Sequence, residues 1–360
     1  KLAADMTADE VEVPENQTSY ITGEFTGTLV GAEGNKAYAI YDLKKPLFDT
    51  LKNATVKDLD LKNTQVDSKE NAAAVAKTAN NATISNVAVE GKVSGRKSVA
   101  GLVVDATNAR IENSSFSGKL VANHADNNAN YTGGIVGKLT GGNAKVDKSK
   151  VDAVISTAAR NNNQTAGGIA GKLENGALVT RSVTTGKILN GRGYSRIGGI
   201  VGSTYPRGRV DNVVSNMNVG DGYATTGDQF GSADVKNAIT YVENKKQDNF
   251  VRKVTKEEAD AKIASYGVTV TLDDTGQDLK ANSKEVDYTT LSQAQVERKV
   301  AYNNIEKLMP FYNKELVVHY GNKVATTDKL YTTELLDVVP MNGNEVVTDI
   351  NNKKNSINRV

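Results

Sequence analysis

The sequence predicts a mainly β protein, a parallel β-helix (solenoid) of about seven coils with an N-terminal β cap and a C-terminal α+β capping region. The first observation is a recurring glycine phrase. Gly-Gly-Ile-Val-Gly begins at residue 133, returns as Gly-Gly-Ile-Ala-Gly at residue 167, and appears again at residue 198. Degenerate copies begin at residues 45, 72, 100 and 227, so the mean period is near 30. A fixed period of this size indicates stacked repeat units.

The second observation is another phrase that follows each start by about twelve residues. Val or Ile always opens it, and positions two, three and five are mostly polar. Strict alternation would turn position three into the core, so the polar residues there predict a bend in a left-handed conformation, which Asn tolerates well. The residues at position three are Asp58, Asn86, Asn113, Lys148, Arg181, Asn212 and Asn237.

The third observation is the choice of residues within each repeat. Gly-Gly-Ile-Val-Gly is typical of a short buried strand whose glycines let neighbouring backbones approach closely. Asn-, Gly- and Ser-rich stretches between the phrases indicate turns. The competing hypothesis, a helical repeat, needs two segments of 10 or more residues with a 3.6 period, and the β-branched phrases disfavour it.

Four regions are predicted along the chain. Residues 1–44 form an N-terminal β cap and residues 45–240 the glycine-rich β-helix. Residues 241–341 form an α+β capping or connecting domain, in which Thr255 and Glu258 make a capping box that opens a short helix. A second helix is expected from Thr290 and a strand at residues 316–320. Residues 342–360 are a polar linker toward a catalytic domain that this sequence does not contain.

The amino-acid composition indicates which kinds of binding partner and site to expect. Forty-four Lys and Arg against 42 Asp and Glu leave a net charge of +2, which gives no reason to expect nucleic-acid binding. The sequence has no run of 18 apolar residues, and residues 1–10 are mixed and polar, so neither a membrane span nor a signal peptide is expected. Cysteine is absent, which removes disulfides and thiolate metal sites. We expect a monomer.

An acidic stripe is one candidate site. Position two of the second phrase carries Glu112, Asp147 and Asp211 on different coils. If the coils are in register, Glu112 and Asp147 lie about one rung apart, where they could share a cation or act as paired carboxylates on a glycan. The alternative is a solvated ladder whose charge is balanced by lysines 148 and 150 and by Arg181.

Protruding loops are the other candidate site. They carry the residue types that bind partner proteins, although loops are also where a solenoid tolerates insertions. The candidate residues are His124, Asp126, Arg192, Tyr194, Arg196, Tyr205 and Arg207.

The repeats, together with the stretches at residues 304–313 and 330–340, resemble the streptococcal surface zinc metalloproteases, the family of the immunoglobulin A1 protease and its paralogues. The resemblance implies a secreted virulence protein attached to the cell wall through peptidoglycan, with a zinc protease domain bearing a His-Glu-x-x-His helix. This sequence has only His124 and His319, and neither starts that motif. The fragment is therefore expected to have no catalytic residue, metal or cofactor of its own, and to correspond to the region before the protease domain.

Two functions remain open. The first is a non-catalytic scaffold and substrate-recognition region, whose partners would be a host glycoprotein such as immunoglobulin A1 and the protein's own protease domain. The second is a carbohydrate-binding or carbohydrate-active β-helix, or an adhesin, acting through the acidic stripe.

Overall fold

A computed structural model of the chain describes residues 1–8, 11–14, 16–33, 36–123, 128–157, 164–190, 196–227, 234–246, 248–267, 316–320 and 323–327. The chain divides into two compact units, Lys1–Leu272 and Asp273–Val360. The first unit is the solenoid. In the second unit, the described residues form an antiparallel hairpin of β27 (Leu316–Tyr320) and β28 (Lys323–Thr327), so the predicted strand at residues 316–320 is confirmed.

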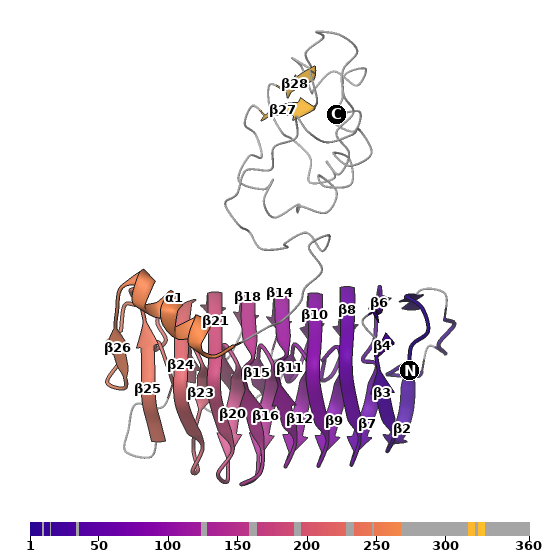
Figure 1. Ribbon diagram of the computed structural model, residues 1–360, viewed down its shortest axis with the longest axis horizontal. Coiled ribbons are helices and arrows are strands. Elements are labelled where there is room, and N and C mark those ends of the chain that lie inside the picture. Colours follow the sequence, from indigo (N-terminus) through magenta and orange to yellow (C-terminus); the bar gives the residue numbers. More distant parts are fainter. Residues whose placement is uncertain are drawn as a thin grey trace. The chain divides into compact units, whose positions relative to one another are not determined.

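The first unit is a parallel β-helix, which confirms the predicted fold class, with about six turns where about seven coils were expected (Figure 1). Three parallel sheets form its walls. The described strands of the largest sheet are β1 (Met6–Thr7), β3 (Thr28–Val30), β6 (Ala39–Tyr41), β8 (Thr55–Ser68), β10 (Thr83–Gly95), β13 (Arg110–Glu112), β14 (Ser115–Ala122), β17 (Lys145–Asp147), β18 (Lys150–Thr157), β21 (Leu178–Asn190), β24 (Arg209–Asn218), β25 (Asp234–Thr240) and β26 (Val251–Lys253).

The other two walls are narrower. The second sheet contains β2 (Ile21–Phe25), β7 (Phe48–Lys52), β9 (Ala76–Asn80), β12 (Val103–Thr107), β16 (Val136–Thr140), β20 (Ala170–Glu174) and β23 (Val201–Ser203). The third contains β11 (Val99–Ala100), β15 (Tyr131–Gly133), β19 (Thr165–Gly167) and β22 (Arg196–Gly198). At the N-terminal end, β4 (Ala32–Glu33) and β5 (Lys36–Ala37) pair as a small antiparallel hairpin.

The predicted bends lie at position three of the second phrase in every copy. All seven residues there have positive φ, from 43° at Arg181 to 53° at Asp58 and Asn86. Neighbouring side chains also bond along the column, because Asn86 donates to Asp58 at 3.0 Å and Asn113 donates to Asn86 at 3.3 Å. The left-handed conformation predicted for this corner is therefore confirmed. It bends the chain at the same position in each coil.

The glycine phrase lies where one coil presses on the next. A Cβ on Gly134 would sit 2.1 Å from the carbonyl oxygen of Gly168, and a Cβ on Gly168 would sit 2.0 Å from that of Gly199. No side chain fits at such distances. The intervening Ile and Val residues point into a continuous apolar interior, where Ile135, Ile169 and Ile200 are fully buried.

Helix α1 (Lys256–Ser265) is the one helix in the described part of the chain, and it lies against the outside of the largest sheet (Figure 1). The hydroxyl of Thr255 caps its start by accepting from the backbone N–H of Glu258 at 3.2 Å, which confirms the predicted helix start. Its buried face meets outward apolar side chains of three successive rungs. This satellite cluster contains Val183, Val214, Ile239, Ala259 and Tyr266.

The satellite cluster is explained by one column of the largest sheet. Register places Ala88, Ser115 and Lys150 in the same outward column as Val183 and Val214 on neighbouring rungs. Small or charged side chains occupy the column early in the solenoid, and apolar ones occupy it only where α1 covers the sheet. The second helix expected from Thr290 lies outside the described residues.

Candidate functional site

The pairing register between strands of neighbouring coils shows how the acidic stripe is arranged. Glu112 on β13 lies directly opposite Asp147 on β17, as the sequence predicted. Asp147 is next to Thr180 on β21, and Thr180 is next to Asp211 on β24. The first two carboxylates are thus adjacent, whereas Asp211 stands two rungs away from Asp147.

Asp147 is the most buried member of the stripe, and cations hold both of its oxygens. Its side chain is 5% exposed. Arg181 donates through Nε at 2.8 Å and through Nη2, and Lys145 donates through Nζ at 2.8 Å. Burial alone would raise the pKa of Asp147, but the hydrogen bonds and charges of Arg181 and Lys145 outweigh it and hold that pKa below its ordinary value.

The two other acidic residues also have partners. Glu112 lies 3.6 Å from the ammonium of Lys145, which therefore bridges two rungs. Asp211 accepts from the side-chain amides of Asn212 and Asn237, both at 2.9 Å. Sequence reasoning identified Arg181 as a balancing charge and missed Lys145, although its position two residues before Asp147 places both side chains on one face of β17.

The described loop residues lie at two places. Arg196 begins β22 and pairs with Thr165 of β19. Tyr205 is 59% exposed in the turn after β23, and Arg207 in the same turn has a φ of 62°. The backbone of that turn is fixed, since Asn175 and Gly176 donate to the carbonyls of Pro206 and Arg207 at 2.8 and 3.0 Å. The other candidates, His124, Asp126, Arg192 and Tyr194, lie outside the described residues.

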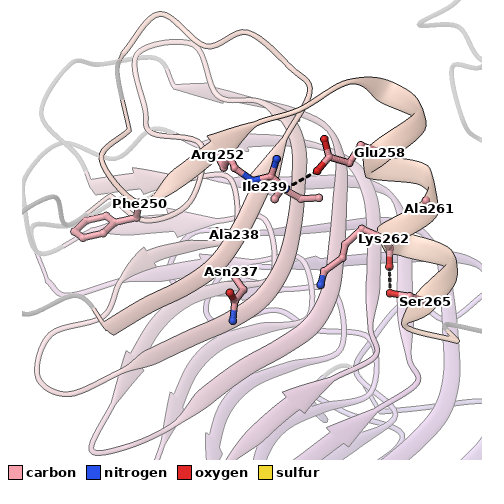
Figure 2. A pocket seen from close by; sticks show the side chains of 9 residues that line it. All are labelled: Asn237, Ala238, Ile239, Phe250, Arg252, Glu258, Ala261, Lys262 and Ser265. Carbon is pink, nitrogen blue, oxygen red and sulfur yellow. Dashed lines mark hydrogen bonds and ion pairs between the residues drawn. The ribbon is translucent and has the colours of Figure 1, made fainter.

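Sequence reasoning did not foresee a groove beside α1 (Figure 2). This open cavity of about 600 Å³ lies between one face of the helix and the last two rungs of the largest sheet. Its lining residues are Asn237, Ala238, Ile239, Phe250, Arg252, Glu258, Ala261, Lys262 and Ser265. We call it the cap groove. The capping box predicted the helix, but nothing local in the sequence shows where the helix packs.

Charge is unevenly distributed in the cap groove. At one end Arg252 and Glu258 form an exposed ion pair. Toward the other, the half-buried Lys262 donates to Asn212 Oδ1 at 3.4 Å and lies 5.7 Å from the ring centroid of Tyr266. No carboxylate of the described residues lies within ion-pair distance of Lys262. Among the described residues, the ammonium of Lys262 is thus partnered by an amide and a ring.

The part of the chain that the structure describes does not gather the ligands of a zinc site. Zinc sites in proteins are built from Cys, His, Asp and Glu. The sequence contains two histidines and no cysteine. The described residues include no group of three or more His, Asp or Glu side chains placed to hold a metal ion. Within the same residues, no helix is long and apolar enough to cross a membrane.

The family model and the relatives that match this chain are all named as proteases. Residues 1–91 match the model of the M26 IgA1-specific metallo-endopeptidase N-terminal region. Aligned over its full length, the chain is 72% identical to zinc metalloprotease ZmpC of Streptococcus pneumoniae serotype 4 and 40% identical to an immunoglobulin A1 protease of Streptococcus sanguinis. It spans 19% and 21% of those proteins, about a fifth of their length.

A solved structure of an IgA1 protease is similar as well. The two superpose with a TM-score of 0.69 at 33% sequence identity, over 85% of this chain and 25% of the other.

Proposed function

Because this chain is homologous over its whole length to streptococcal zinc metalloproteases of the ZmpC and immunoglobulin A1 protease family, we propose that it is a non-catalytic scaffold and substrate-recognition region of such a protease. The substrate would be a host glycoprotein such as immunoglobulin A1. The longer protein would be secreted and held at the bacterial cell wall, where it would contribute to virulence.

The observation that carries the proposal is the continuity of the three parallel sheets. Hydrogen bonds link every coil to the next from β2 to β23 and from β8 to β26, and one apolar cluster runs through the interior. Such a body is stiff along its axis because each rung is held by its neighbours. A stiff body can fix the distance between a bound substrate and a catalytic domain elsewhere in the protein.

The acidic stripe supports the same choice over a carbohydrate-active enzyme. Glycoside hydrolysis uses two carboxylates on either side of the scissile bond, and one of them must be free to act as a base or nucleophile. In this chain both oxygens of Asp147 are engaged by Arg181 and Lys145, and both oxygens of Asp211 accept side-chain amides. With Asp147 and Asp211 engaged, Glu112 has no free second carboxylate beside it, so the stripe is better explained as a structural ladder of ion pairs and amide hydrogen bonds.

Binding of the full chain to immunoglobulin A1 tests the proposal. Surface-immobilised chain should retain immunoglobulin A1, and Tyr205→Ala should weaken binding, because Tyr205 is a large exposed side chain on a fixed turn. Arg110→Ala is the matched control, since Arg110 is exposed on a different wall. Absence of binding to immunoglobulin A1 and to other host glycoproteins would remove the recognition role and leave only spacing.

A further inference from the structure

We infer that the cap groove is a docking site for a segment of a protein partner that places an acidic side chain against Lys262. The inference deepens the proposed function, on which it rests, because it gives the recognition region a second contact surface. That surface lies on β25, β26 and α1, and none of its lining residues belongs to the turn that holds Tyr205.

The charge of the groove selects an acidic group. Lys262 is half-buried and has no carboxylate partner among the described residues. The other two charged residues of the groove, Arg252 and Glu258, form an ion pair with each other, so their charges cancel. An ammonium gains more from an ionised partner than from an amide, since charge-assisted hydrogen bonds are the stronger ones. A carboxylate in the groove would meet that need.

The other lining residues of the cap groove favour a peptide over a free anion as the ligand. The lining also includes the apolar side chains of Ile239, Ala261 and Phe250. An anion alone would leave this surface without a partner, whereas a peptide with alternating acidic and apolar side chains covers both. The helix face toward the groove carries residues 258, 261, 262 and 265, which are spaced as one side of an α-helix, so the wall is continuous.

The groove exists because α1 uses a different face to hold itself to the solenoid. Ala259 and Tyr266 pack on the apolar column of the largest sheet, while Ala261 and Lys262 stay on the groove side. A change at Ala261 therefore alters the groove without entering the packed face. Ala261 is exposed, and so is Ala264, which does not line the groove.

Fluorescence polarisation with the full chain tests the inference. The probes are a fluorescein-labelled octapeptide of alternating Val and Glu and its counterpart of alternating Val and Lys. We expect the acidic peptide to bind and the basic one not to. Ala261→Glu should weaken the acidic peptide about tenfold or more by filling the groove and repelling it, and Ala264→Glu should leave its affinity unchanged. Lys262→Met should weaken it similarly, and Lys262→Arg should retain it.

Several results would overturn the inference. They are absence of acidic-peptide binding, equal binding of both peptides, or equal effects of Ala261→Glu and Ala264→Glu. Free glutamate that competes as well as the peptide would show a small-anion site instead. Circular dichroism confirms that each variant is folded. Retention of immunoglobulin A1 that depends on Tyr205 but not on Ala261 would keep the proposed function while rejecting this docking site.

Discussion

At the scale of single residues, the corner of the largest sheet explains which substitutions the solenoid tolerates. Five of its seven positions carry Asn or Asp, and the other two carry Lys148 and Arg181, at φ of 49° and 43°. The left-handed region is energetically unfavourable for residues other than Gly, Asn and Asp, because the Cβ atom approaches the following carbonyl oxygen. At Arg181 the conformation brings the guanidinium to Asp147, whereas Lys148 makes no ion pair with a described residue.

Lys148→Asn is therefore expected to stabilise the protein. Asn fits the corner and could join the amide ladder, so the free energy of unfolding should rise by about 1 kcal/mol. Arg181→Asn relieves the same corner but leaves the buried carboxylate of Asp147 with Lys145 alone, which costs about 1–3 kcal/mol, so no net gain is expected. Urea unfolding measures the free energy of both variants. Stabilisation by Arg181→Asn would contradict the role of Arg181 as a stabilising partner of Asp147.

The pH dependence of stability should report Asp147. Its pKa in the folded protein lies below the ordinary value of 3.8. The unfolded state therefore binds its proton first, so Asp147 contributes full stability above about pH 4, which is lost as the pH falls through the folded pKa. Arg181→Gln should raise that pKa toward the unfolded value, so the free energy of unfolding, measured in urea, should be lower near neutral pH and should fall less as the pH drops below about 4. With Asp147→Asn as the background, Arg181→Gln should no longer change this pH dependence.

At the scale of elements, the close stacking of the glycine phrases on successive coils leaves no room for a side chain at these positions. Adjacent walls meet where Gly134, Gly168 and Gly199 follow one another on successive coils. The obstacle to a side chain there is a backbone carbonyl of the next coil, which cannot rotate away as a side chain could.

Gly168→Ala should therefore destabilise the protein by about 3 kcal/mol or more, since overpacking against rigid backbone has no cheap relaxation. Gly142 provides the matched control, because a Cβ there would meet nothing within 4 Å. Gly142→Ala should change the free energy of unfolding by no more than about 0.5 kcal/mol. Equal thermal midpoints for the two variants would argue against the stacking explanation.

At the scale of the whole molecule, the solenoid is a structural unit that ends within the chain. Lys1–Leu272 forms one compact unit and Asp273–Val360 another. Residues 1–272, expressed alone, should unfold cooperatively at the same midpoint as the full chain, because the apolar interior and the cap helix both belong to this unit. Differential scanning calorimetry tests this, and a lower midpoint would show that the second unit stabilises the first.

The sequence by itself determined the architecture, because both repeated phrases carry their structural reason locally. Asn at position three requires a backbone that few residues tolerate, and Gly-Gly-Ile-Val-Gly combines close approach with a buried strand. The capping box likewise predicted the start of α1. Periodicity then made one repeat sufficient to predict its neighbours.

Only the tertiary structure decided which charges meet and where the helix lies. Arg181 is 34 residues from Asp147, and Lys262 is 50 residues from Asn212. The register between coils and the packing of α1 across the rungs bring each pair together. The number of residues in a coil varies, so sequence spacing cannot fix such neighbours. The cap groove likewise exists only because the helix crosses the sheet with one face packed and another left open.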